Sequence, residues 1–257
     1  MALLTLNFYA HSLGVGATVN VILPQTRGDV PPMQSLYLTH GGGGDHTYYC
    51  RNYPMEQMLD GYHVAAIMPS TPSRYKLANL KHAEQWFTFV SEELPEICNN
   101  MFNLSRDRMD TFAMGGSGGG YNSLKLGLRN PERFGVIAAM CPALLCQRFV
   151  EELIAKPDDP VRNQGGADFK ALFGDQVPDE DDAFKFLEAA AMKGVKTKIF
   201  HTCGTEDWLY KINKDFFNRA KELDFNIEWD ERPGGHTAEY GREMMPEFIR
   251  WLPLKRL

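Results

Sequence analysis

The first residues alternate between apolar and polar side chains with the period of a β-strand. Residues 3–9 and 18–23 alternate or are rich in β-forming types, and a glycine-containing stretch at 11–16 separates them. This pattern predicts an antiparallel hairpin. Two continuous apolar runs follow at 35–39 and 63–68. Such runs indicate buried strands, and each of these two stops at a predicted functional loop.

Helical spacing appears in the middle of the chain. Apolar residues within 80–102 recur at near-helical intervals, and Pro95 is expected to kink this segment or to begin a second helix. Residues 110–114 then predict a short strand, 121–129 a helix and 134–140 another strand. A strand, a glycine turn, a helix and a strand form a βαβ unit, whose parallel strands need a crossover of this kind.

After the sixth predicted strand the strand pattern disappears. Residues 142–196 contain helical patches near 148–155 and 182–192, and we expect a helical, cap-like insertion here. The remaining predicted elements are strands at 198–203 and 227–229 and helices at 212–223 and 239–251. The pattern predicts a single α/β domain over residues 1–257, with a mostly parallel central sheet and helices on both faces.

Composition and charge narrow the possible functions. The 257 residues are 44% hydrophobic and 23% charged, which is ordinary for a globular protein. A net charge of -6 supplies no electrostatic reason to bind nucleic acid or an anionic membrane. No secretory signal or transmembrane run is recognisable, and the five cysteines lack C-x-x-C spacing. We therefore expect a cytoplasmic protein with free thiols.

A glycine-rich motif at residues 115–119, Gly-Gly-Ser-Gly-Gly, satisfies the pattern G-x-S-x-G. It stands between a predicted strand and a predicted helix, where this motif forms a sharp turn that exposes the serine hydroxyl beside a helix N-terminus. Ser117 is therefore the predicted nucleophile. The alternative is a flexible glycine loop in which the serine is incidental.

A serine hydroxyl needs a base that accepts its proton, and the base needs an acceptor that orients it. Asp207 follows the predicted strand at 198–203, and His236 follows the one at 227–229. Nucleophile, acid and histidine thus occur in the order expected when each lies on a loop after a strand. We predict His236 as the base and Asp207 as the acid, with Glu206 as a rival acid.

Backbone N–H groups are expected to stabilise a developing oxyanion. The residue after the nucleophile, Gly118, supplies one, and the glycine loop after the strand at 35–39 supplies the other. We favour Gly42 as the second donor, with Gly41 or Gly43 as alternatives. A tight glycine turn without chemistry is the competing interpretation of this loop.

The substrate pocket is predicted from side chains that flank these loops or begin the insertion. They are His46, Tyr48, Trp208, Tyr210, Leu144 and Leu145, each of which could instead serve ordinary packing. Aromatic walls would accept an acetylated sugar, a hydroxycinnamoyl group or a small alcohol ester. The motifs G-x-G-x-x-G, the P-loop and H-E-x-x-H are missing from the sequence, so we expect no cofactor and no metal.

Four segments together resemble a known family. They are HGGGGDHTYY at 40–49, MGGSGGGYNSLKLGLRNPERFG at 114–135, CGTEDWLY at 203–210 and PGGH at 233–236. Over nearly the whole chain the sequence resembles the esterase D-like branch of α/β-hydrolases, which includes S-formylglutathione hydrolases and feruloyl or acetyl-xylan esterases. It looks most like the bacterial tributyrin esterases. One departure is Gly118, where the family more often carries a bulky residue.

The resemblance implies an α/β-hydrolase fold, hydrolysis of short acyl esters of small molecules, and often a homo-oligomer. We therefore expect a serine carboxylesterase. An S-formylglutathione hydrolase or other thioesterase is one alternative, and an acyltransferase, as in the mycolyltransferases that share this scaffold, is another. The non-enzymatic alternative is an inactive hydrolase that serves as a binding module.

Overall fold

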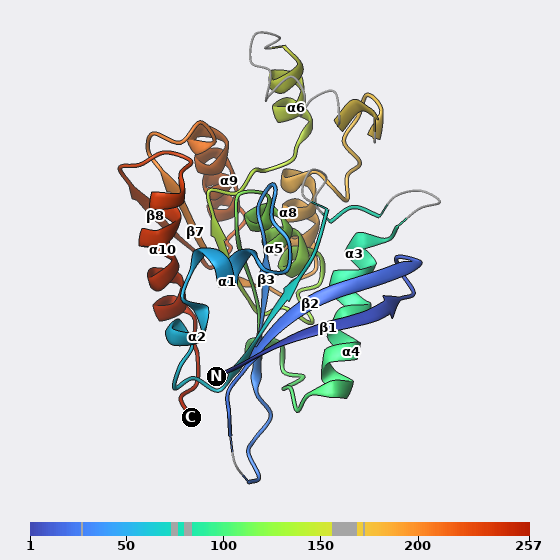
Figure 1. Cartoon of the computed structure of the whole chain (residues 1–257). Helices are drawn as coiled ribbons and strands as arrows, with labels where there is room; N and C mark the ends of the chain where they lie inside the picture. Colours follow the sequence, from blue (N-terminus) through green and yellow to red (C-terminus); the bar gives the residue numbers. More distant parts are fainter. Residues whose placement is uncertain (27, 73–76, 80–83, 156–168, 172) are drawn as a thin grey trace.

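One mixed β-sheet organises the molecule. The computed structural model describes residues 1–26, 28–72, 77–79, 84–155, 169–171 and 173–257. Within them, eight strands lie in the order β1-β2-β4-β3-β5-β6-β7-β8 (Figure 1). They are β1 (Ala2–Ala10), β2 (Val15–Leu23), β3 (Gln34–Thr39), β4 (Val64–Pro69), β5 (Thr111–Gly116), β6 (Val136–Met140), β7 (Lys198–Gly204) and β8 (Ile227–Arg232). Only β1 with β2 and β2 with β4 pair antiparallel, so the predicted hairpin and mostly parallel sheet are confirmed.

The helices lie on both sides of this sheet. They are α1 (Tyr48–Asn52), α2 (Met55–Met58), α3 (Trp86–Thr88), α4 (Leu94–Met101), α5 (Gly118–Arg129), α6 (Gln147–Ile154), α8 (Ala183–Met192), α9 (Tyr210–Glu222) and α10 (Ala238–Trp251). The predicted helices near α5, α6, α8, α9 and α10 are confirmed, whereas α1 and α2 were not predicted. The arrangement is the α/β-hydrolase fold that the sequence indicates.

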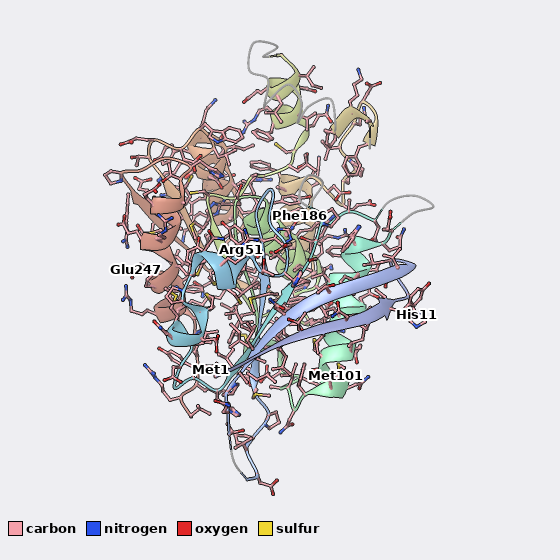
Figure 2. All side chains as sticks on the ribbon, viewed as in Figure 1. Met1, His11, Arg51, Met101, Phe186 and Glu247 are labelled. Atoms are coloured by element: carbon pink, nitrogen blue, oxygen red, sulfur yellow. The ribbon has the colours of Figure 1, made fainter. Side chains whose placement is uncertain are left out.

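Both faces of the central strands are buried. Leu36 and Leu38 of β3 pack into a core shared with α1, α2 and α10, whereas Tyr37 between them packs into the core on the opposite face. β6 repeats the pattern, with Ala138 in the first core and Ile137 on the other side. Side chains fill the layers between the sheet and the helices (Figure 2). Strands buried on both faces favour apolar residues on both, which explains the continuous apolar runs within them.

The helical segment predicted over residues 80–102 is divided by a π-helical turn, Phe89–Glu93, between α3 and α4. Pro95 lies in the first turn of α4. Glu93 and Leu94 both have helical backbone angles, so the run from Trp86 to Met101 continues through Pro95 and no separate helix starts there. The π-helical turn directly before the proline shifts the hydrogen-bond register where its missing N–H falls. Whether the segment is kinked at Pro95 stays a prediction. Residues 80–83 lie outside the described part of the chain.

The segment 142–196, predicted to be an insertion, contains α6 and α8. α6 projects at the top of Figure 1, while α8 packs against α5. Residues 156–168 and 172 of this segment are not among those described, and its role as a cap on a single domain stays a prediction. None of the helices in the described part of the chain has the length and apolar character that crossing a bilayer requires.

Candidate active site

Ser117 occupies the sharp turn between β5 and α5. The strand ends at Gly116 and the helix begins at Gly118, so the serine alone connects the two elements. Its φ of 56° and ψ of -122° lie in a region that L-residues rarely adopt. Strain of this kind costs on the order of 1 to 3 kcal/mol and concentrates at functional sites. The predicted strand, turn and helix around the motif are therefore present.

Two glycines of the motif are required by close backbone contacts. A Cβ on Gly119 would lie 1.8 Å from the carbonyl oxygen of Thr39, and a Cβ on Gly115 would lie 2.5 Å from the same atom. Neither position can carry a side chain. Gly118 differs, because its Cβ would meet nothing closer than the backbone nitrogen of Gly42 at 3.9 Å. The helix therefore packs tightly against β3, while position 118 has room for a side chain.

Three side chains from distant parts of the chain meet at this turn. Nε2 of His236 lies 2.9 Å from Oγ of Ser117, and its Nδ1 lies 2.8 Å from Oδ2 of Asp207. An ionised carboxylate only accepts hydrogen bonds, so in the neutral imidazole Nδ1 carries the proton and Nε2 accepts from the serine. The structure thus brings together the three residues that the sequence singled out as nucleophile, base and acid. Their catalytic roles stay a prediction.

Two loops place the acid beside the base. A Cβ on Gly204 would lie 2.1 Å from the carbonyl oxygen of Gly234, and the N–H of Glu206 donates to that oxygen at 3.0 Å. Asp207 then turns inward, where its Oδ1 accepts from the N–H of Leu209 at 2.9 Å. The side chain of Glu206, the rival acid, is exposed. Asp207 is therefore the carboxylate in contact with the imidazole.

Burial and hydrogen bonding set the charges of this pair. Burial raises the pKa of Asp207, but hydrogen bonds from His236 and from the N–H of Leu209 bring it below its ordinary value. The carboxylate is therefore ionised at neutral pH. Burial lowers the pKa of His236, whereas the hydrogen bond and charge of Asp207, together with the Cys141 side chain, raise it to about 9. The imidazole is consequently most available as a base in alkaline solution.

Two backbone N–H groups lie beside the nucleophile. Gly118 is the first residue of α5, where N–H groups have no intrahelical acceptor, and the N–H of Ser117 itself already donates to Met140. Gly42 approaches from the loop after β3, and its backbone nitrogen would lie 3.9 Å from a Cβ on Gly118. Both predicted oxyanion donors therefore lie next to Ser117.

His40 orients the peptide group that contains the Gly42 N–H. Its Nε2 accepts from the N–H of Thr71 at 3.0 Å, so its Nδ1 donates to the carbonyl oxygen of Gly41 at 2.8 Å. In a trans peptide the N–H points away from the C=O, so the Gly42 N–H points away from His40. This arrangement favours Gly42 over its neighbours as the second donor.

Comparison with known proteins identifies the family of the chain. Residues 10–252 match the model of the family described as "Putative esterase". The chain belongs to this esterase family. An acetyl esterase from Caldicellulosiruptor saccharolyticus is 27% identical over 266 residues, covering 98% of both chains.

Two solved structures of hydrolases have a fold similar to that of the esterase. FphF, a fluorophosphonate-binding serine hydrolase of Staphylococcus aureus, has a TM-score of 0.84 at 24% identity and covers 98% of each chain. The S-formylglutathione hydrolase FrmB of Staphylococcus aureus has a TM-score of 0.82, also at 24% identity and 98% coverage of each chain. The fold is thus that of the α/β-hydrolases, and the family match makes the protein an esterase.

A cavity of about 240 Å³ opens beside Ser117 in the esterase. Its side-chain walls include Tyr48, Tyr49, Tyr53, Met140, Tyr240 and Met245. Only Tyr48 of these was predicted. Tyr49 and Tyr53 were missed because α1 is too short for a clear helical period. Tyr240 and Met245 were missed because the sequence does not show which side of the helix after His236 faces the cavity. The spacing of Tyr49 and Tyr53, four residues apart, was the one available signal of a shared helical face.

Trp208 lies on the other side of the base. Its ring, 47% exposed, is 6.0 Å from the ring of His236 between centroids and stacks on Phe149 of α6 at 5.9 Å. The side chain therefore connects the loop of the acid with the predicted insertion. A role of Trp208 in substrate binding stays a prediction, and this position is compatible with it.

The other predicted pocket residues do not line the cavity. His46 bonds a serine hydroxyl after β4, and the hydroxyl of Tyr210 donates to Glu231 of β8 at 2.7 Å. The leucines at the start of the insertion, Leu144 and Leu145, are buried in the core. Apolar side chains that follow a buried strand fill the core first, and Tyr210 lies on the side of α9 that faces β8. Any contact of these four residues with substrate stays a prediction.

Proposed function

We propose that the esterase hydrolyses short-chain acyl esters of small alcohols or acylated sugars through an acyl-enzyme on Ser117. The observation that carries this proposal is the continuous hydrogen-bond chain from Ser117 through His236 to Asp207, which ends at a small cavity. A serine alone is a weak nucleophile, and this arrangement supplies the base that activates it.

The reaction then follows from the positions of the groups. His236 Nε2 accepts the Ser117 proton as Oγ attacks the ester carbonyl, while the N–H groups of Gly118 and Gly42 stabilise the oxyanion. The imidazolium next protonates the leaving alcohol, and the acyl group remains on the serine. A water molecule repeats the sequence and releases the acid. Asp207 stays ionised throughout and orients the imidazole.

The size of the cavity supports a short acyl group. Pockets for drug-sized ligands have volumes of about 300 to 1,000 Å³, so a cavity of about 240 Å³ suits an acyl chain between acetyl and butyryl. The name of the Caldicellulosiruptor saccharolyticus relative, an acetyl esterase, agrees with this range. We expect kcat/KM for p-nitrophenyl esters to fall beyond butyryl in an acyl-length series. An increase towards octanoyl would contradict the proposed acyl site.

A neutral ester suits the cavity better than S-formylglutathione, the substrate after which the similar hydrolase FrmB is named. Glutathione carries two carboxylates, and none of the described residues that line the cavity is a lysine or an arginine. A comparison of p-nitrophenyl acetate, feruloyl esters and S-formylglutathione at equal concentration separates these substrate classes. Faster hydrolysis of S-formylglutathione would instead favour the function of an S-formylglutathione hydrolase.

The replacement Ser117→Ala tests the nucleophile. We expect turnover of p-nitrophenyl acetate to disappear, leaving at most roughly 10³ to 10⁴-fold catalysis over water, as in other enzymes that lose a triad member. Circular dichroism of the variant serves as the control for folding. Labelling of the parent protein by a fluorophosphonate probe, and its loss in the variant, checks the same residue without a substrate.

Two outcomes would redirect the proposal. Turnover close to that of the parent in the folded Ser117→Ala variant would refute the assignment of the nucleophile. Formation of glycerol esters in excess glycerol, at the expense of free acid, would make acyl transfer to an alcohol the main reaction.

A further inference from the structure

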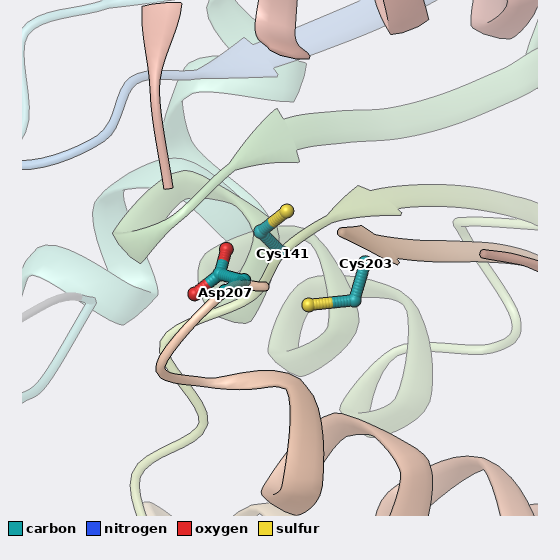
Figure 3. A group of neighbouring side chains, drawn as sticks. All are labelled: Cys141, Cys203 and Asp207. Atoms are coloured by element: carbon teal, nitrogen blue, oxygen red, sulfur yellow. The ribbon is translucent and has the colours of Figure 1, made fainter. Parts of the chain in front are cut away.

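Two cysteines lie side by side next to the proposed acid. Met140 and Thr202 are paired in the parallel ladder of β6 and β7, so the residues that follow them, Cys141 and Cys203, emerge together at the ends of these strands. The N–H of Cys141 donates to the carbonyl oxygen of Thr202 at 2.7 Å, which extends the pairing to this point. Figure 3 shows both thiols beside Asp207, which lies on the loop after β7.

The three side chains form a compact cluster of metal-ligating groups. The Sγ atoms of Cys141 and Cys203 and one carboxylate oxygen of Asp207 all lie within 4.8 Å of one another. All three residues are buried. Zinc bonds thiolate sulfur at about 2.3 Å, so two thiolates on one tetrahedral ion lie about 3.8 Å apart. The two sulfurs would need to approach by no more than about 1 Å to reach this spacing.

The backbone of Cys141 has a strained conformation. Its φ of 41° is in the left-handed region, where residues other than glycine are uncommon and costly. Cys141 also lines the cavity beside Ser117, so an ion in that cavity can reach the cluster without passing through the core.

We propose that Cys141, Cys203 and Asp207 form an inhibitory binding site for a soft divalent cation of the Zn²⁺ or Cd²⁺ class. Two sulfurs and one carboxylate oxygen are ligands that suit such ions, and a water molecule completes four-coordination. In the process the cation replaces two thiol protons, which are released to solvent, while the carboxylate is already ionised.

Inhibition follows from the position of Asp207, and this step rests on the proposed function. The carboxylate that ligates the cation no longer offers its full charge to His236, whose Nδ1 it contacts at 2.8 Å. The imidazole then loses the acceptor that orients it. A cation at this cluster therefore weakens the base without contacting the nucleophile.

Titration with Cd²⁺ tests the binding site without any substrate. We expect the ultraviolet thiolate-to-cadmium charge-transfer absorption to saturate at one ion per chain, and to disappear in the Cys203→Ser variant. Cys50→Ser is the matched control, because Cys50 is a free thiol outside the cluster, and this variant should retain the absorption. Retention of the full signal in Cys203→Ser, or its loss in Cys50→Ser, would overturn the proposal. If Cys203→Ser does not fold, Cys203→Ala replaces it in the same titration.

Turnover of p-nitrophenyl acetate in the presence of Zn²⁺ tests the consequence. We expect the inhibitory concentration to rise at least about 10-fold in Cys203→Ser, with turnover in the absence of metal unchanged and the parent enzyme restored by EDTA. Equal inhibition of both proteins would overturn the inhibitory role. Because the absorption does not depend on turnover, a saturable signal without inhibition would overturn the inhibitory role and leave the binding site in place. A parent protein that does not hydrolyse the ester would contradict the proposed function and leave the titration interpretable.

Discussion

The charge of His236 depends on two opposing contributions. Burial disfavours the imidazolium, while the Asp207 carboxylate at 2.8 Å favours it and, with the Cys141 side chain, raises the pKa to about 9. A base is active only when neutral, so a raised pKa removes activity from the acid side of the pH profile. The residue that makes the imidazole a strong base thus also determines the pH range in which it acts.

We expect kcat/KM for p-nitrophenyl acetate to rise with pH and to reach half of its plateau near about 9, where His236 loses its proton. In Asp207→Asn the rise of kcat/KM with pH should move towards lower pH, because the carboxylate that raises the pKa of His236 is gone. The plateau of kcat/KM should fall by roughly 10⁴-fold. A pH profile of both proteins, with p-nitrophenol read at a pH-independent wavelength, measures the shift. A rise of kcat/KM at the same pH in the variant and the parent would contradict this role of Asp207.

At the scale of elements, the start of α5 determines where the nucleophile lies. The helix begins directly after Ser117, three residues earlier than the spacing of its apolar side chains predicts, and its first turn packs against the end of β3. Only glycine permits that contact at position 119, because the carbonyl oxygen of Thr39 fills the space of a Cβ. Position 118 has no such neighbour.

Alanine replacements at the two neighbouring glycines are expected to differ. Gly119→Ala should prevent recovery of folded protein, since its Cβ would lie 1.8 Å from a backbone oxygen. Gly118→Ala should fold with a melting temperature at or above that of the parent, because alanine in a helix is favoured over glycine by up to about 1 kcal/mol and its Cβ makes only ordinary contacts. Thermal unfolding of purified protein measures both. Equal behaviour of the two variants would contradict the packing described for α5.

Strands and long helices could be predicted because their side-chain periods follow from burial. β1, β2 and the central strands appear where alternation or continuous apolar runs predict them, and α9 and α10 appear where the apolar positions recur at helical spacing. The short helices α1 and α2 have too few residues for a period. The π-helical turn before Pro95 is likewise invisible in the pattern, because it changes hydrogen-bond register and leaves the apolar spacing nearly unchanged.

At the scale of the whole molecule, one buried cation connects segments that are far apart in the sequence. Lys125 of α5 is buried, forms an ion pair with Asp181 and donates to the carbonyl oxygen of Leu77. The N–H of Leu77 in turn donates to Asn122 of the same helix. The helix that begins at the nucleophile is therefore tied both to the segment before α3 and to the residues before α8.

We expect Lys125→Met to destabilise the protein by about 3 to 5 kcal/mol, because it leaves the Asp181 carboxylate buried without a partner. The double replacement with Asp181→Leu should recover much of this loss, since apolar pairs often replace buried ion pairs without penalty. Chemical denaturation of the parent, the single variant and the double variant measures the differences. A single variant as stable as the parent, or a double variant less stable than the single one, would contradict this account.

The expected homo-oligomer and cytoplasmic location stay predictions.

The sequence by itself determined the order of the elements, the strand–turn–helix around Ser117 and the loops that carry Asp207 and His236. These features depend on local periodicity and on residues next to one another in the chain. Only the tertiary structure decided which side chains meet: the choice of Asp207 over Glu206, the tyrosine-lined cavity, and the pairing of Cys141 with Cys203. Such contacts join residues dozens of positions apart, and they arise from strand order and register, which no local pattern contains.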